Sequence, residues 1–370
     1  MSLGRAMAAA GHRVIVISEL KGPPAPTTVN GIECRYVAEA EPPVFWKRIS
    51  FRLLFGKLQN RLRRATMDIA NDVHIDELIC VHRPIAPLLA ALSLSMSLRS
   101  TRVTILLLDF AMETLPSNPI GRHLRRAQYR RLYSRAWHAA HRVVAMSFFR
   151  SAIDPFCQVA GLRKPAYIEL PLLYPSPTMN LDADTDDPRP AVIRVVYVGT
   201  FSPRWRSPVH MLTVLSGCLA ADDRLELHLY SSGCEEDVER FAAIWPERLI
   251  VHGLVSPDEA RMAVNTAQVL INVSNDLPNS VPGKIWEYFA SGLPIITFCS
   301  RRDDPSLVYL HKYPLGLILS GGSPNDIPST LSFLANHAGS RIPFQQVEQI
   351  FPENLPSRAA ALLLSNLAAT

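Results

Sequence analysis

In the second half of the chain, short apolar runs alternate with segments of helical character. The apolar runs do not alternate with polar residues, as is typical of strands buried on both faces. The predicted strands are Arg194–Gly199, Leu225–Tyr230, Leu249–His252, Gln268–Val273, Pro294–Phe298 and Leu315–Leu319. The predicted helices are Ser207–Leu219, Glu235–Ile244, Pro257–Val264, Pro282–Ser291 and Asn325–His337. This rhythm predicts βαβ units and a parallel sheet covered by helices on both faces.

The first half shows the same alternation less regularly. Its predicted strands are His12–Ile17, Glu77–Val81, Arg102–Leu107 and Arg142–Met146. The stretch Tyr174–Pro190 is rich in Pro and Asp and poor in apolar residues, a composition typical of linkers. We therefore expect one α/β domain over residues 1–174, a linker over 175–190 and a second α/β domain over 191–354. The apolar segment 355–370 is predicted to form a helix that packs across the domain junction.

Composition excludes several classes of protein. The chain has 370 residues, of which 19% are charged, which suits two folded domains better than disorder. No apolar run reaches the roughly 18 residues that span a bilayer, and we read no signal peptide at the start. The six cysteines are scattered without a CxxC pair. They predict free thiols in the cytoplasm and no metal site.

The net charge of +5 is unevenly distributed. Residues 1–174 hold 24 Lys/Arg and 12 Asp/Glu, a balance of +12, and residues 175–370 hold 14 and 21, a balance of −7. Two segments, Val44–Arg64 and Thr114–Ile153, carry seven and eight basic residues and no acidic one, with aromatic residues among them. This pattern favours an anionic membrane surface over a plain solvated face. Nucleic acid ranks last, because no nucleic-acid-binding signature accompanies the charge.

The segment Asn275–Phe298 carries the most informative candidate site. Ser280 is the expected N-cap of a helix that starts near Pro282, with Gly292 as its end. Lys284 and Glu287 are three residues apart, so they share one helix face. Such a helix start can bind phosphate, and a carboxylate one turn later can accept hydrogen bonds from a ribose diol. An ordinary surface ion pair would show the same spacing.

A second candidate lies in Val195–Ser207, where a predicted strand ends at Gly199 and Thr200. Arg204 and Arg206 follow in the turn before the next helix. Loops after parallel strands carry ligands in this architecture, and two arginines suit a diphosphate. The alternative is two solvated loop arginines. The turn matches neither a dinucleotide fingerprint nor a P-loop.

Together these segments resemble the GT-B glycosyltransferases, in particular the large retaining group called family 4 or group 1. The resemblance rests on VVYVGTFSPRWRS, on LIVHGLVSPDEARMAVNTAQVLINVS and on VPGKIWEYFASGLPIITF. It covers about 150 residues well and extends weakly into the first half. It implies two Rossmann-like, doubly wound domains and a nucleotide-diphosphate sugar donor held by the C-terminal domain. Glu287 would bind the ribose, and Arg204 or Arg206 with Lys284 would neutralise the diphosphate.

The chain departs from the family pattern at three places. The family often has two glutamates separated by seven residues; Glu287 fits the second, while Asn279 stands at the first. The usual Asn-Gly after the last N-domain strand is replaced by Leu170-Pro171-Leu172. The sequence also begins at the family's first helix, so the N-terminal domain lacks its first strand and the Gly-rich loop.

The resemblance implies transfer of a sugar to a glycan or lipid-linked acceptor, with no cofactor and no metal. The site residues would then be Gly199, Thr200, Arg204, Arg206, Asn279, Ser280, Lys284 and Glu287, with Glu287 also in a catalytic role. Asp109, which follows a predicted strand, is a candidate for an acceptor contact or a base, or else a loop cap. Two alternatives stay open: a non-catalytic relative that binds nucleotide or partners another transferase, and a nucleotide-sugar epimerase. The expected location is cytoplasmic, on the inner membrane face.

Overall fold

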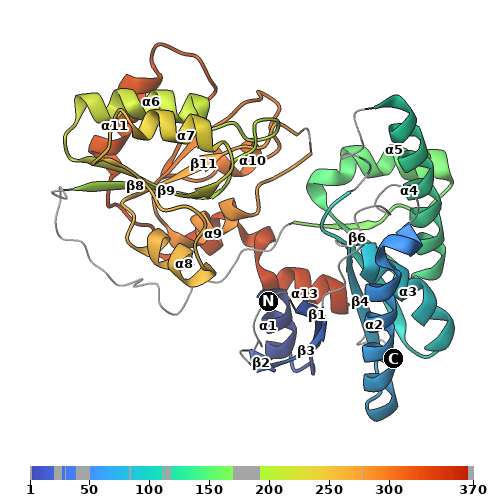
Figure 1. Cartoon of the computed structure of the whole chain (residues 1–370). Coiled ribbons are helices and arrows are strands. Elements are labelled where there is room, and N and C mark those ends of the chain that lie inside the picture. Colours follow the sequence, from blue (N-terminus) through green and yellow to red (C-terminus); the bar gives the residue numbers. More distant parts are fainter. Residues whose placement is uncertain are drawn as a thin grey trace. The chain divides into compact units, whose positions relative to one another are not determined.

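The computed structural model describes residues 2–20, 27–29, 31–38, 51–82, 85–110, 112, 118–169, 192–277 and 279–365. The chain divides into two compact units, one of residues 1–171 together with 353–370, and one of residues 172–352. The predicted linker, residues 175–190, lies outside the described residues. Figure 1 shows the elements of each unit.

The N-terminal unit is built from helices and mostly parallel strands, with β2 antiparallel to β3. Its elements are α1 (Ser2–Ala9), β1 (Ile15–Leu20), β2 (Thr28–Val29), β3 (Ile32–Ala38), α2 (Phe51–Asp72), β4 (Glu77–His82), α3 (Ile85–Ser97), β5 (Arg102–Leu107), α4 (Pro119–Ala139), β6 (Arg142–Met146), α5 (Arg150–Ala160), β7 (Ala166–Ile168) and α13 (Pro356–Leu364). A short 3-10 turn, Ser147–Phe149, precedes α5. Its strands form two sheets with the orders β1-β3-β2 and β4-β5-β6-β7.

Two large apolar clusters and a small one around Cys80 cover the described strands of the N-terminal unit. The first packs α1, α4, α5 and α13 around β5 and β6, with Tyr133, Trp137 and Leu363 almost fully buried. The second packs α2 and α3 against β3, with Leu58, Leu62 and Ala90 in its centre. Leu58 and Leu62 are thus core residues, although the basic segment Val44–Arg64 suggested a membrane-facing role for them. The structure does not describe the other apolar side chains of that segment.

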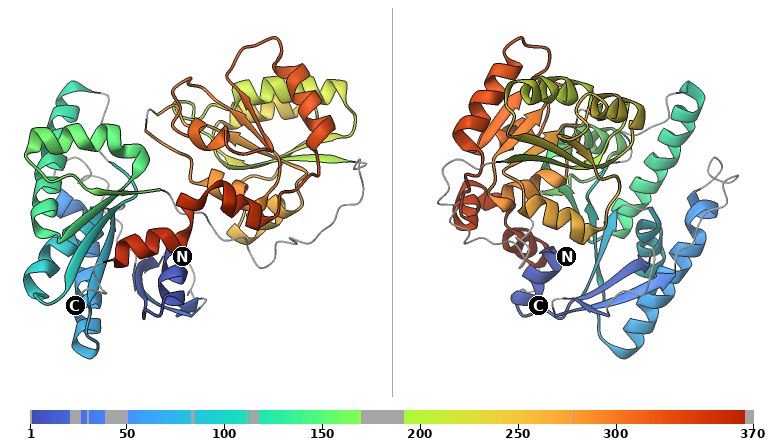
Figure 2. Two further views of the ribbon diagram at one scale, coloured as in Figure 1. Left: turned by 180° about the vertical axis from the view of Figure 1, so that it is seen from behind. Right: turned by 60° about the vertical axis from the view of Figure 1, so that its left-hand side comes forward.

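The C-terminal unit holds one sheet between two layers of helices (Figure 2). Its elements are β8 (Ile193–Thr200), α6 (Val209–Ala221), β9 (Leu225–Ser232), α7 (Glu235–Ala242), β10 (Leu249–Val251), α8 (Pro257–Asn265), β11 (Val269–Val273), α9 (Lys284–Ser291), β12 (Ile295–Phe298), α10 (Leu307–Leu310), β13 (Gly316–Leu319), α11 (Asp326–His337) and α12 (Phe344–Ile350). The strand order is β10-β9-β8-β11-β12-β13, and every pairing is parallel. The doubly wound α/β fold is therefore confirmed.

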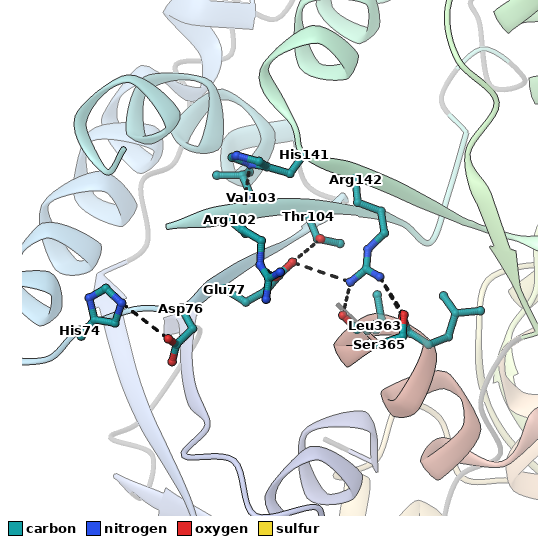
Figure 3. Close-up of polar contacts among 11 residues, drawn as sticks. His74, Asp76, Glu77, Arg102, Val103, Thr104, His141, Arg142, Leu363 and Ser365 are labelled. Carbon is teal, nitrogen blue, oxygen red and sulfur yellow. Dashed lines mark hydrogen bonds and ion pairs between the residues drawn. The ribbon is translucent and has the colours of Figure 1, made fainter. Parts of the chain in front are cut away.

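The end of the chain belongs to the N-terminal unit, where α13 packs against α1. An ionic cluster fastens it there (Figure 3). Arg142 donates to the carbonyl oxygens of Leu362, at 2.9 Å, and of Leu363, which are orphan acceptors at a helix C-terminus. The Glu77 carboxylate, only 8% exposed, lies 3.9 Å from the same guanidinium and 3.4 Å from that of Arg102. These residues start β4, β5 and β6, so the cluster lies at the amino edge of the sheet.

No helix among the described residues is long and apolar enough to cross a membrane. The helix α4 shows how the basic segment Thr114–Ile153 is arranged. Its aromatic residues Tyr133 and Trp137 are core residues, while its arginines lie mostly on the surface. The aromatic part of that pattern is explained by packing, and the basic part is a surface property.

Candidate functional site

The order of the strands in the C-terminal unit defines a topological switch point between two neighbouring strands of the sheet. The chain runs from β8 outward through β9 to β10, then returns to β11 on the other side of β8 and continues outward to β13. β8 and β11 are the strands between which the direction of winding reverses. In open α/β sheets, ligands bind outside the carboxyl ends of the two strands at such a switch point.

The hydroxyl of Tyr288 joins α9 to β8 at this position. β8 pairs with β11 only from Val195 to Tyr197. At the next residue the Tyr288 hydroxyl accepts a hydrogen bond from the Val198 N–H at 3.1 Å and donates one to the Val198 carbonyl at 3.3 Å. The helix α9, which carries Lys284 and Glu287, is therefore fixed against the end of β8.

Burial keeps the phenols at this position protonated. Burial raises the pKa of Tyr288 well above its ordinary value. It also raises the pKa of Tyr197 to about 12, with the nearby Arg206 guanidinium acting in the opposite direction. Both hydroxyls are therefore neutral groups at physiological pH, and neither is a candidate base.

Three loops meet at the carboxyl edge of β8, β11 and β12. Arg206, from the loop after β8, donates through Nε and Nη2 to Oδ1 of Asn275, after β11, at 3.0 and 2.6 Å. The backbone of the same two loops is joined where Asp276 N–H donates to the Trp205 carbonyl at 2.8 Å. Arg301, after β12, lies 3.7 Å from Asp276. The switch point is thus surrounded by loops that hold one another in place.

Lys284 and Glu287 form an ion pair on α9, with 2.6 Å between Nζ and Oε2. Both side chains are about one third exposed, so solvent and a ligand can reach them. Their predicted placement on one helix face is correct. Gly292 ends the helix in the left-handed conformation, with φ of +72°.

The predicted cap at Ser280 is wrong, because α9 begins at Lys284 and Gly283 occupies the N-cap position. The Ser280 hydroxyl instead accepts a hydrogen bond from Nδ2 of Asn275 at 2.9 Å. Asn275 thus bridges Arg206 and Ser280. Asn279 lies in the same connection between β11 and α9.

The other predicted site residues are spread over two units. Gly199 and Thr200 end β8, and the Thr200 carbonyl accepts from Nη1 of Arg206 at 3.4 Å. The guanidinium of Arg204 stacks on the ring of Trp205, 4.2 Å from its centroid. Asp109 follows β5 and belongs to the N-terminal unit. Within the C-terminal unit, the structure therefore brings together the predicted residues around β8 and α9.

Sequence reasoning missed three residues at the carboxyl edges of the two units. Asn275 and Tyr288 are described above. His82 ends β4 of the N-terminal unit and is 1% exposed, with its Nε2 3.5 Å from the hydroxyl of the buried Tyr133. A histidine directly after a predicted strand was the signal for it. Among the described residues, no group of His, Cys, Asp and Glu could hold a metal ion.

The match to a known protein family falls within the C-terminal unit. Residues 193–327 match the family model described as "Glycosyl transferases group 1". Over this range the C-terminal unit resembles the group 1 glycosyltransferases. The matched range begins with β8, contains the switch point and reaches the start of α11. A search of curated protein sequences gives no significant match.

Several solved structures resemble nearly the whole chain at low sequence identity. A glycosyltransferase from Rickettsia africae has 12% identity and a TM-score of 0.57, covering 100% of this chain and 92% of its own. WaaG, a glycosyltransferase involved in lipopolysaccharide biosynthesis, has 12% identity and a TM-score of 0.57, covering 98% and 94%. A putative UDP-N-acetylglucosamine 2-epimerase from Listeria monocytogenes has 12% identity and a TM-score of 0.54, covering 97% and 96%. These likenesses show the GT-B fold.

Proposed function

We propose that the protein transfers a sugar, of hexosyl type and with retention, from a nucleotide-diphosphate donor to a glycan or lipid-linked acceptor. The observation that carries the proposal is the Lys284–Glu287 pair, held by Tyr288 beside the switch point of a unit that resembles the group 1 glycosyltransferases. We place the nucleotide diphosphate there. The reaction needs no cofactor, and the donor is a substrate.

The Lys284–Glu287 ion pair contributes little free energy, so contacts with a ligand can replace it. A partly exposed pair of this kind contributes about 0–1 kcal/mol, because water screens both charges. Hydrogen bonds to charged groups contribute about 1.5–3 kcal/mol. Ribose hydroxyls on Glu287 and a phosphate on Lys284 can therefore replace the pair at little cost.

Positive charge at this edge would stabilise the leaving diphosphate as the sugar departs. Lys284 supplies one cation, and Arg204 and Arg206 supply two more from the loop after β8. Arg206 already donates to Asn275 and to Thr200, which fixes its guanidinium in place before a ligand arrives. A cation fixed in advance loses little entropy on binding.

Calorimetry with a panel of nucleoside diphosphates tests the site. We expect Glu287→Ala to weaken binding by roughly 1.5–3 kcal/mol, the range for a hydrogen bond to a charged group. Glu353→Ala, which removes a carboxylate from an exposed pair with Arg358, is the matched control and should bind as the parent does. Unchanged affinity in Glu287→Ala would remove this residue from the site.

The cations are tested by comparing a nucleoside diphosphate with the nucleoside alone. The parent should prefer the diphosphate, and Arg204→Ala, Arg206→Ala and Lys284→Ala together should erase most of that preference. A preference that survives in the single variants and in the triple variant would show that these residues are only surface charge.

For the acceptor we propose a molecule at an anionic membrane surface on the cytoplasmic face, as in cell-surface polysaccharide synthesis. The support is α4, which contains no acidic residue. Its surface carries exposed apolar side chains, Ile120 at 76% and Leu124 at 58%, beside a row of exposed arginines. These arginines are Arg122, Arg126, Arg130, Arg131 and Arg135.

Sedimentation with liposomes tests the membrane proposal. Binding should require anionic lipid and weaken in high salt, since each basic residue near the surface contributes about 1 kcal/mol. Replacing Arg122, Arg126 and Arg130 by Gln should lower binding and leave nucleotide affinity intact. Equal binding to neutral and anionic liposomes, or binding to neither, would make α4 an ordinary solvated helix.

A second candidate function is a non-catalytic nucleotide-binding partner of another transferase. Asn279 supports it, because an amide stands where the family often has a carboxylate. The two functions differ in turnover: a transferase releases nucleoside diphosphate from its donor, slowly even without acceptor, and a binding partner does not. If Asn279→Glu produces release that the parent lacks, the second candidate is favoured.

A further inference from the structure

The arginines at the carboxyl edge of the C-terminal sheet differ in their partners. Arg301 donates to both carboxylate oxygens of Asp303, at 3.0 and 2.7 Å, and lies 3.7 Å from Asp276. Two acidic side chains therefore neutralise most of its charge. Arg204 is exposed and stacks on the ring of Trp205. Neither of these arginines presents an uncompensated charge in a direction that polar contacts fix.

Arg206 is different, because neutral groups hold its guanidinium. Oδ1 of Asn275 accepts from Nε at 3.0 Å and from Nη2 at 2.6 Å, and the Thr200 carbonyl accepts from Nη1 at 3.4 Å. Within the described part of the chain, no carboxylate forms an ion pair with Arg206. A guanidinium has five N–H donors, of which these contacts use three, so two remain for a ligand. Arg206 thus keeps its charge while its direction is fixed.

The orientation of the Asn275 amide follows from its two neighbours. A guanidinium can only donate hydrogen bonds, so the amide oxygen has to face Arg206. The amide nitrogen then faces Ser280, and Nδ2 donates to the hydroxyl of Ser280 at 2.9 Å. One side chain therefore joins the loop after β8 to the segment that leads into α9.

The backbone that carries Asn275 is anchored on both sides. Ser274, directly before it, is fully buried, and its N–H donates to the Phe298 carbonyl of β12 at 3.0 Å. Asp276, directly after it, donates its N–H to the Trp205 carbonyl at 2.8 Å. Asn275 is thus a rigid support, as a side chain that orients a ligand-binding group has to be.

We propose that Asn275 is a positioning residue, which directs Arg206 toward the diphosphate of the donor without cancelling its charge. This rests on the donor site proposed above. It makes Arg206 the main phosphate contact of its loop, because a cation held in advance loses less entropy on binding than the exposed Arg204 does. The neutral amide is part of the role: a carboxylate would hold Arg206 as firmly but would repel the phosphates.

Calorimetry with the 5′-diphosphates of uridine, guanosine and adenosine, each compared with its nucleoside, tests the proposal. The measured quantity is the diphosphate preference, the ratio of the two dissociation constants. Asn275→Ala should lower it about two- to tenfold, because the ligand must then order Arg206 itself. The affinity for the nucleoside should stay as in the parent. A purely structural role for Asn275 would instead weaken the binding of both ligands alike.

Asn275→Asp separates position from charge, and it remains decisive if Asn275→Ala fails to fold. The new carboxylate still accepts from Arg206, yet the diphosphate preference should fall at least about tenfold, because a negative charge then lies beside the phosphates. Added salt should reduce this loss, since it is coulombic. Asn325→Ala, which removes an exposed amide at the start of α11, is the matched control and should keep the parent's preference.

A double-mutant cycle determines whether Asn275 acts through Arg206. In the Arg206→Ala variant, the further change Asn275→Ala should not alter the preference. An equal loss with and without Arg206 would refute the positioning role. If the parent prefers the diphosphate and both Asn275 variants do so equally, this proposal is overturned while the donor site stands. A parent without preference for any of the three diphosphates would overturn the donor site and this proposal together.

Discussion

Replacing Tyr288 by phenylalanine removes the hydroxyl that joins α9 to β8. The ring is almost fully buried, so no water can take the place of the lost oxygen. The change leaves the N–H and the carbonyl of Val198 without the partners they now have at 3.1 and 3.3 Å. It leaves the shape of the apolar core unchanged.

The expected cost follows from those two backbone groups. An unsatisfied buried donor or acceptor costs about 1–3 kcal/mol, so the two groups together should cost about 2–6 kcal/mol. Because each 1.4 kcal/mol is a factor of ten, local opening of β8 should become at least about thirty times more frequent. The same loosening should lower the affinity for nucleoside diphosphate, since Lys284 and Glu287 are carried by the helix that Tyr288 holds.

Hydrogen exchange of β8 amides and nucleotide calorimetry measure the two effects. Tyr313→Phe is the matched control, because its hydroxyl is also buried and donates to a single acceptor, the Leu293 carbonyl, at 2.8 Å. It should cost about 1–3 kcal/mol, for one unsatisfied group, and leave β8 exchange unchanged. If Tyr288→Phe exchanges and binds like the parent, the hydroxyl does not position α9.

Three further predictions concern other parts of the molecule. Arg142→Met should destabilise the docking of α13 by about 3 kcal/mol, because it leaves the buried Glu77 carboxylate with one cation fewer. Limited proteolysis should then release the C-terminal segment of this variant but not that of Arg358→Ala, which removes only an exposed ion pair. Gly292→Ala should destabilise the C-terminal unit far more than Gly253→Ala, because both have φ above +70° but only the Cβ at 292 collides with the Ile342 carbonyl; equal shifts in Tm would contradict this. Burial, with a smaller contribution from His228, lowers the pKa of His252. The neutral form therefore stabilises the fold above about pH 6.5, and that stability is lost as the pH falls below this value. Thermal unfolding of His252→Phe, which keeps an aromatic ring against Tyr230, should depend less on pH in this range than unfolding of the parent does.

The strands of the C-terminal unit could be predicted almost residue by residue. Each is a short apolar run, and glycine or proline lies near the ends of several of them, as at Gly199 and Pro294. In the N-terminal unit, β3 was missed because Glu33 and Arg35 interrupt its apolar residues. β7 was missed because it has only three residues.

The detailed site could be predicted only in part. The spacing of Lys284 and Glu287 determines their shared helix face, because that relation is local. The contact between Arg206 and Asn275 joins residues 69 positions apart, and a single sequence carries no signal for it. The predicted N-cap at Ser280 is wrong because the Ser280 hydroxyl binds the side chain of Asn275 instead of the first turn of α9. Periodicity likewise could not distinguish a core-facing from a membrane-facing side for Leu58 and Leu62.

The return of the chain to the N-terminal unit has a consequence for its biosynthesis. Residues 353–370 complete a unit whose other part ends at residue 171, so the whole C-terminal unit is an insertion within it. At 5–20 residues per second, a ribosome needs about 10–40 s to translate the intervening stretch. During that interval the surface of α1 that later contacts α13 has no partner from its own chain. The C-terminal unit can fold before the N-terminal unit is finished, so the order of completion is the reverse of the order in which the two units begin.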